Sequence, residues 1–76
     1  LGSYDKSAEA YRLAVKTDPQ MYLAWNGLGV NALNRWLISE RSDDAALAEA
    51  SESFRASLRL HDDQTKVAKL VTQYGL

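Results

Sequence analysis

The sequence of 76 residues contains no cysteine, one histidine and one proline. The absence of cysteine excludes a disulfide framework and a thiolate metal site. A single histidine, His61, leaves no pair of imidazoles for a metal or catalytic cluster. The sequence also lacks the G-x-S-x-G, P-loop and H-E-x-x-H patterns. We therefore predict a protein that is not an enzyme and has no catalytic residues, no metal site and no cofactor.

An excess of charge of one sign is absent as well. Nine Lys and Arg residues stand against ten Asp and Glu residues, which gives a formal net charge of −1. This balance provides no basic field for nucleic acid. No apolar run approaches the roughly 20 residues of a membrane span, and no cationic leader precedes an apolar stretch. We expect no nucleic acid and no membrane as partners, one domain over residues 1–76, and a cytoplasmic location.

The apolar residues recur with helical spacing in four segments that are separated by polar turns. Pro19 marks the end of the first segment, because the residue before proline is disfavoured in a helix. The pattern predicts an all-α fold without strands. The predicted helices cover residues 5–17, 22–39, 44–60 and 64–74. Their expected N-cap residues are Ser3 or Asp5 for the first helix, Ser42 or Asp43 for the third and Asp63 for the fourth.

The most specific stretch of the sequence is Trp25 to Gly29, inside the second predicted helix. Trp25, Leu28 and Ala32 share one face, because they are spaced i, i+3 and i+7. Gly29 adjoins that face and costs about 1 kcal/mol relative to alanine in a helix. A glycine here indicates that a large side chain of another helix lies against the backbone. The overlapping segment Gly27 to Ala32 matches the dinucleotide pattern G-x-G-x-x-A. That motif requires a preceding strand, whereas the residues before Gly27 are in helical phase, so we interpret the glycines as a sign of close helix packing.

The spacing of Trp25, Leu28 and Gly29 resembles the first helix of a tetratricopeptide (TPR) repeat, whose period is about 34 residues. Residues on either side extend the resemblance in the same phase: Gly2, Tyr4, Tyr11, Ala14 and Pro19 before it, and Ala50, Phe54, Ser57 and Asp62 after it. The resemblance implies antiparallel helix pairs stacked in a right-handed superhelix, and a non-catalytic scaffold for protein–protein interaction. Because Gly2 and Tyr4 are in register with the family pattern, we also expect a piece of a longer array.

An internal similarity accompanies this resemblance. The segment Glu9 to Arg12 matches Glu52 to Arg55, 43 residues further on, so the central repeat exceeds the family period by about nine residues. The excess falls around Trp36 to Asp44. Trp36 either fills the core between the second and third helices or anchors a partner, since tryptophan is enriched in binding hot spots.

The resemblance also implies which residues contact a partner. In family phase, the concave groove is lined by Leu23, Asn26, Val30, Leu33 and Asn34 of the second helix and by Lys66, Lys69 and Gln73 of the fourth. The implied partner is a protein or peptide, because amides hydrogen-bond a peptide backbone and lysines attract carboxylates. Gly27 and Leu70 stand where chaperone-binding relatives have Asn and Arg, so we do not expect a chaperone tail.

Three alternatives remain open. The first is a structural subunit of an assembly, which contacts partners through its convex face or through the insertion, Trp36–Asp44. The second is a small-ligand-binding domain. The third is self-association of the chain through exposed end helices. At the C-terminus we expect Tyr74 and Leu76 to pack against a following helix, because the ends of an array normally need a polar cap.

Overall fold

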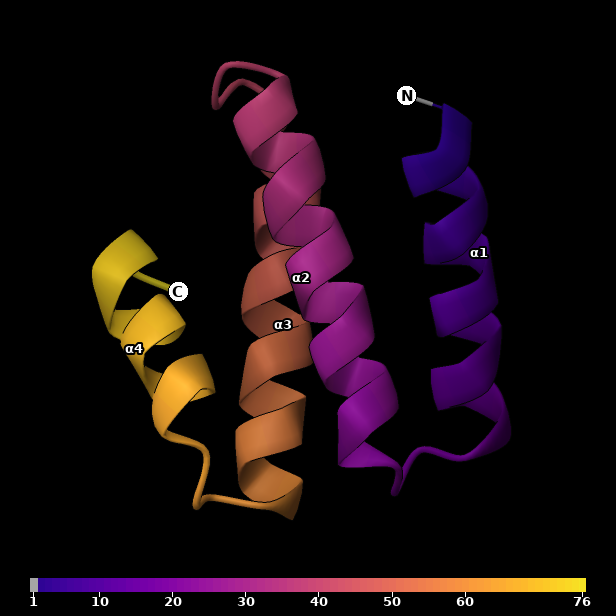
Figure 1. Ribbon diagram of the computed structural model, residues 1–76, viewed down its shortest axis with the longest axis vertical. Helices are drawn as coiled ribbons and strands as arrows, with labels where there is room; N and C mark the ends of the chain where they lie inside the picture. The colour runs from indigo at the N-terminus through magenta and orange to yellow at the C-terminus, as the bar shows by residue number, and fades with distance from the viewer. Residues whose placement is uncertain (1) are drawn as a thin grey trace.

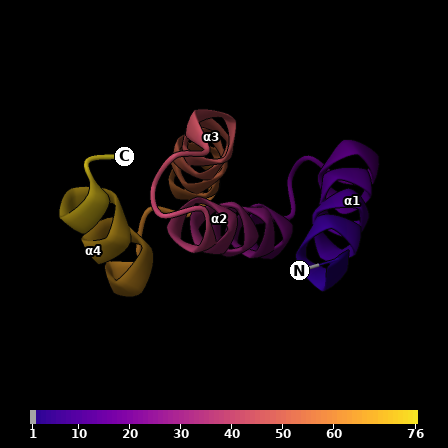
Figure 2. The same cartoon turned by 90° about the horizontal axis from the view of Figure 1, so that it is seen from above.

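The computed structural model describes residues 2–76, which form four α-helices and no strand. The helices are α1 (Gly2–Thr17), α2 (Tyr22–Ile38), α3 (Asp44–Leu60) and α4 (Thr65–Tyr74). Consecutive helices run in opposite directions, as Figure 1 shows. The central pair is α2 and α3, with α1 packed on α2 and α4 packed on α3 (Figure 2). The predicted all-α fold is confirmed, and the largest difference is that α1 begins three residues earlier than expected.

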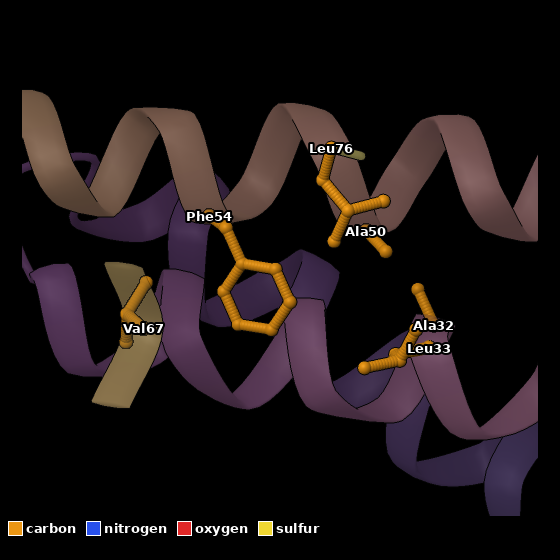
Figure 3. Packing of buried hydrophobic residues seen from close by; sticks show 6 residues of the cluster. All are labelled: Ala32, Leu33, Ala50, Phe54, Val67 and Leu76. Carbon is orange, nitrogen blue, oxygen red and sulfur yellow. The ribbon is translucent and has the colours of Figure 1, made fainter. Parts of the chain in front are cut away.

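The core of the central pair is built around Phe54 of α3. Its side chain is completely buried, and a Cβ atom at Gly29 of α2 would lie 2.7 Å from its Cε1 atom. The expected close approach of a large side chain to Gly29 is therefore confirmed. Figure 3 shows the cluster around this ring. Its buried members are Ala32, Leu33, Ala50, Phe54, Val67 and Leu76, which come from α2, α3, α4 and the residues after α4.

A smaller cluster joins α1 to α2. Val15 of α1 packs with Ala24 and Leu28 of α2, and Trp25 lies against this group. The indole Nε1 of Trp25 donates a hydrogen bond of 3.0 Å to the carbonyl oxygen of Pro19. This bond fixes the turn between α1 and α2, so Trp25 holds the turn as well as packing in the helix interface.

Only one of the three predicted caps is confirmed. Asp43 caps α3, because its Oδ1 accepts a hydrogen bond of 3.1 Å from the amide of Ala46. The expectation for α1 is wrong, since α1 begins at Gly2 and both expected residues lie inside it. The expectation of Asp63 for α4 is also wrong. Gln64 occupies the N-cap position, but its side chain turns back to α3 and donates to the carbonyl oxygen of His61.

The residues after α4 fold back onto α3. Gly75 adopts a left-handed conformation with φ of 67°, which only glycine accommodates easily. Leu76 is then buried in the core, and its carbonyl oxygen accepts 2.8 Å hydrogen bonds from Ser51 Oγ and Arg55 Nε. Leu76 and the partly buried Tyr74 both pack on the core within residues 2–76, and the expectation that they also pack against a following helix stays a prediction.

The excess residues of the central repeat form the last turn of α2 and the loop Ser39–Asp43. Trp36 is partly buried against the core, with its ring edge-on to Tyr74 of α4 at a centroid distance of 6.0 Å. The guanidinium of Arg41 lies 5.5 Å from the centre of the Trp36 ring. The structure thus favours the interpretation of Trp36 as a core residue, although it packs towards α4 as well as α3.

Candidate functional site

Four of the predicted groove residues lie in one line along α2, which we call the α2 stripe: Leu23 and Val30, which are exposed, and Asn26 and Asn34, which are partly buried. Their spacing of three or four residues places them on one side of the helix. The α2 stripe lies between the sides of α2 that contact α1 and α3. Leu23 is 63% exposed and Val30 is 46% exposed, although most apolar residues of α2 are buried or partly buried. The α2 stripe therefore keeps two large apolar side chains in solvent.

Leu33 does not belong to this exposed surface. It follows Gly29 by four residues, so it lies on the side of α2 that faces α3. Its exposure is 6%, and it packs in the cluster that contains Phe54. The assignment of Leu33 to the groove is corrected accordingly, because family phase alone does not indicate how far α3 wraps around this side of the helix.

Asn26 is hydrogen-bonded to Gln64, the N-cap residue of α4. Its Nδ2 atom donates a 2.7 Å hydrogen bond to Oε1 of Gln64. The Nε2 atom of Gln64 donates in turn to Ser57 Oγ and to the His61 carbonyl oxygen, at 2.9 and 2.6 Å. The Oδ1 atom of Asn26 is buried and has no hydrogen-bond partner within residues 2–76. Asn26 therefore ties α2 to the turn before α4, and its amide nitrogen is already engaged.

The three predicted residues of α4 are all exposed. Lys69 and Gln73 line a shallow depression of about 490 Å³ on the surface of α4, together with Thr65, Ala68 and Thr72. None of the α2 stripe residues lines this depression. The predicted site residues are thus divided between the α2 stripe and the surface of α4.

A second hollow lies between α1 and α2 and was not predicted from the sequence. This α1–α2 groove has a volume of about 390 Å³, and its lining residues are Tyr4, Ser7, Tyr11, Asn26, Gly27, Val30, Asn31 and Asn34. The Tyr11 ring lies on Gly27, where it leaves no room for a Cβ atom. Tyr11 is nevertheless 37% exposed. The helical pattern of α1 predicted it as a packing residue, which accounts for the ring's contact with α2 but not for its open side.

An ion-pair network fixes α1 against α2 and α3. Arg12 donates through Nε and Nη2 to the two carboxylate oxygens of Glu49, at 2.8 and 2.9 Å, and Arg35 donates to the same carboxylate. The hydrogen bond from Arg12 lowers the pKa of Glu49, and Arg35 acts in the same direction, while partial burial opposes both. Arg35 Nε also donates to buried Asn31, whose Nδ2 donates 2.9 Å to the Tyr4 carbonyl oxygen.

This network lies beside the α1–α2 groove, because Tyr4 and Asn31 belong to both. The two ends of the Arg12–Glu49 pair are 37 residues apart in the chain. A sequence pattern gives no signal for such a pair, since charged residues at helix surfaces usually contact water. The network sets the position of α1 and therefore the width of the groove.

His61 is the C-cap residue of α3 and is exposed, as a solvated C-terminal cap would be. The sequence did not predict its neighbour: the Tyr22 ring stacks on the imidazole with centroids 4.6 Å apart. Within residues 2–76, no group of three or more His, Asp or Glu side chains is placed to hold a metal ion. No helix in the same range is both long enough and apolar enough to cross a membrane.

No protein-family model, curated protein or solved structure matches the chain. Its function is therefore inferred from the surfaces described above.

Proposed function

We propose that this chain is a TPR-like, non-catalytic module that binds a protein or peptide partner. The observation that carries the proposal is the α2 stripe. Single exposed apolar residues are common on protein surfaces, but Leu23 and Val30 lie two turns apart on one side of the central helix. The other sides of that helix are covered by α1 and α3. An apolar surface of this kind is typical of an interaction site.

The helix bounds support a TPR-like stack of repeats with an extended central unit. Thr17 and Leu60, which end α1 and α3, are 43 residues apart, and so are Tyr22 and Thr65, which begin α2 and α4. The sequence similarity between α1 and α3 has the same offset. The same offset in two pairs of helix bounds and in a sequence motif supports the proposed right-handed superhelix, in which α2 and α4 line the concave side.

The surface chemistry indicates what the partner offers. Leu23 and Val30 bury apolar side chains of the partner, at roughly 25 cal/mol per Å² of buried apolar area. Lys66 and Lys69 on α4 attract carboxylates. A surface of two apolar anchors and two lysines is small, so the complex belongs to the weak, transient class of interfaces. We propose a partner segment with two apolar residues and neighbouring acidic residues. The proposed cytoplasmic location rests on the cysteine-free composition.

A library of random peptides displayed on phage tests this function. Peptides selected on the unmodified chain are expected to bind a variant with Leu23→Glu and Lys66→Glu at least about tenfold more weakly. Both positions are exposed, so helical circular dichroism should remain unchanged. The matched control carries Leu13→Glu and Lys16→Glu, two exposed positions on α1 with the same chemical changes. Equal binding to the test and control variants would contradict the proposal.

A second candidate is an assembly subunit that uses the insertion around Trp36–Asp44. Trp36 is occupied by its contacts with Tyr74 and Arg41. The exposed apolar residue of this region is Ile38, which lines a depression of about 210 Å³ near the start of α1. If Ile38→Glu removes binding of the selected peptides while Leu23→Glu does not, the insertion is the binding surface.

A further inference from the structure

The spacing of the two exposed apolar residues of the α2 stripe restricts the conformation of a segment that binds there. Leu23 and Val30 both lie in α2, seven residues apart in the sequence. Seven residues are nearly two helical turns, so the two side chains lie on one side of α2, about 10.5 Å apart along its axis. A segment that covers both anchors must therefore present two apolar side chains of its own with a similar separation.

An α-helix meets this requirement, whereas a β-strand does not. Residues i and i+7 of a helix that lies along α2 repeat the spacing of Leu23 and Val30. In a strand, the residues on one side are two or four apart, which gives about 7 or 13 Å. The nearest alternative is a polyproline II segment, in which residues i and i+3 share one side about 9.3 Å apart.

The polar groups between the two anchors also favour a segment that satisfies its own backbone. Asn26 lies between Leu23 and Val30, and its Oδ1 atom is buried. Its Nδ2 atom already donates to Gln64 and has only a second hydrogen to offer. Within residues 2–76, the α2 stripe thus has no free side-chain acceptor between the anchors. Peptide N–H groups of an extended segment would lose water there without gaining a partner, whereas a helix bonds its own amides.

The charges beside the α2 stripe indicate an acidic occupant. The hydrogen bond from Asn26 to Gln64 places the start of α4 beside the stripe. Lys66 and Lys69 follow Gln64 on α4, and both are exposed. A second copy of the chain could offer the same apolar pair through its own α2, but α2 contains no Asp or Glu. A second copy would therefore bring no carboxylate from α2 to these lysines.

We infer that the α2 stripe docks an acidic amphipathic α-helix of the partner. Apolar residues at i and i+7 of that helix pack on Leu23 and Val30. Its Asp or Glu residues lie on the side that faces Lys66 and Lys69, where lysines form charge-assisted hydrogen bonds with carboxylates. This inference rests on the proposed function and adds the conformation of the bound segment and the spacing of its apolar residues.

A set of matched peptides tests the conformation. The probe is an alanine-based peptide of about 20 residues, long enough to be helical in water, with leucines at i and i+7 and glutamates along one side. Titration into the ¹⁵N-labelled full chain should cause saturable shifts of the Leu23 and Val30 amide signals. A peptide of the same composition with leucines at i and i+5, on different sides of its helix, should bind at least about tenfold more weakly. A proline-rich peptide with leucines at i and i+3 and the same glutamates should also bind at least about tenfold more weakly.

An exchange of charge tests the acidic side of the helix. A chain with Lys66→Glu and Lys69→Glu should bind the glutamate probe at least about tenfold more weakly. It should bind more tightly a probe whose glutamates are replaced by lysines. The matched control carries Lys6→Glu and Lys16→Glu, the same charge change at exposed positions of α1. At about 0.15 M salt, where charges are screened beyond about 8 Å, the control should leave both affinities unchanged.

Several results would overturn the inference. Binding of the proline-rich peptide or of the i and i+5 peptide as tight as that of the probe would show that the bound segment is not the proposed helix. An unchanged affinity of the Lys66→Glu, Lys69→Glu chain would exclude the acidic side. If light scattering finds a dimer that Val30→Glu converts to a monomer, a second copy covers the α2 stripe and the partner helix is wrong.

The absence of saturable shifts up to about 1 mM probe would also overturn the helix. The proposed function has its own test, because it fails only if phage-selected peptides bind its test and control variants equally. Selected peptides that depend on Leu23 and Lys66 but bind in an extended conformation would leave the proposed function standing and remove this inference alone.

Discussion

The ring of Phe54 on α3 lies against the backbone of Gly29 on α2, so closely that a Cβ atom at Gly29 would be 2.7 Å from the ring. This contact sets the distance between the two central helices. α1 and α4 pack on this pair from opposite sides. The contact therefore fixes the spacing of the pair on which α1 and α4 are packed.

Gly29→Ala is expected to destabilise the chain in spite of alanine's higher helix propensity. The added methyl group overpacks a fully buried site, which costs typically 1–3 kcal/mol, while the propensity gain is about 1 kcal/mol. We expect a net loss of up to about 2 kcal/mol and a lower melting temperature, measured by circular dichroism.

Gly27→Ala provides the matched comparison for this prediction. It has the same propensity gain, but the side chain it meets is that of Tyr11, which is partly exposed and can turn into the α1–α2 groove. Its loss of stability should therefore be smaller than that of Gly29→Ala. If both variants melt at the same temperature, Phe54 does not constrain the helix approach.

Acid is expected to lower the free energy of unfolding by protonating Glu49. Because folding lowers the pKa of Glu49, mainly through the hydrogen bond from Arg12, the ionised carboxylate stabilises the fold above its ordinary pKa of 4.5. This stabilisation is lost as the pH falls through the lowered pKa. Partial solvent exposure limits the contribution to about 1 kcal/mol or less.

Urea unfolding from neutral pH to below about pH 4 measures this effect. The Glu49→Gln variant should show a smaller decrease in the free energy of unfolding over this range. Glu52→Gln is the control, because Glu52 is exposed on the same helix and forms no ion pair within the described residues. A Glu49→Gln variant with the unmodified pH dependence would show that the network contributes nothing to stability.

Glu40→Asn is expected to stabilise the loop between α2 and α3. Glu40 has φ of 57°, a left-handed conformation that costs most residues about 1–2 kcal/mol and that asparagine tolerates better. We expect a gain of about 0.5 kcal/mol in the free energy of unfolding, measured with urea. Asp63→Asn makes the same charge change at an exposed turn residue and should have no such gain. A Glu40→Asn variant that is less stable than the unmodified chain would show that the left-handed backbone at Glu40 is not strained.

Trp36→Ala is expected to loosen the attachment of α4. Trp36 is partly buried and packs edge-on against Tyr74, so its removal should cost about 2 kcal/mol, less than the 3–5 kcal/mol of a fully buried tryptophan. Hydrogen exchange should accelerate first in α4. Trp36→Phe keeps an aromatic ring and should lose less. If Trp36→Ala leaves α4 protected, the alternative role of Trp36 as a partner anchor regains support.

The helices and the close packing at Gly29 were predictable because they depend on local signals. Helical periodicity, the proline after α1 and the Asp43 cap act over a few residues. All four helices end within one residue of the prediction, and three of them also begin within one residue of it. The glycine inside an apolar helix also predicted a close contact. It did not identify Phe54 as the side chain in that contact, since this depends on the register of α3.

The candidate surfaces were predictable only in part. Phase along α2 indicated Leu23 and Val30, which are exposed, but the same phase included Leu33, which α3 covers. The α1–α2 groove was missed because each of its walls looks like an ordinary packing face when α1 or α2 is considered alone. Gln64 and Asn26 form their hydrogen bond across 38 residues, and no sequence spacing indicates it.

The sequence by itself determined the class of fold, most of the helix bounds and the sides of each helix that are apolar, because these follow from backbone propensity and spacing along one helix. Only the tertiary structure decided which apolar residues remain exposed and which charges meet. Those outcomes depend on how neighbouring helices pack over one another. That packing is set by contacts between residues that are distant in the chain, such as Arg12 and Glu49.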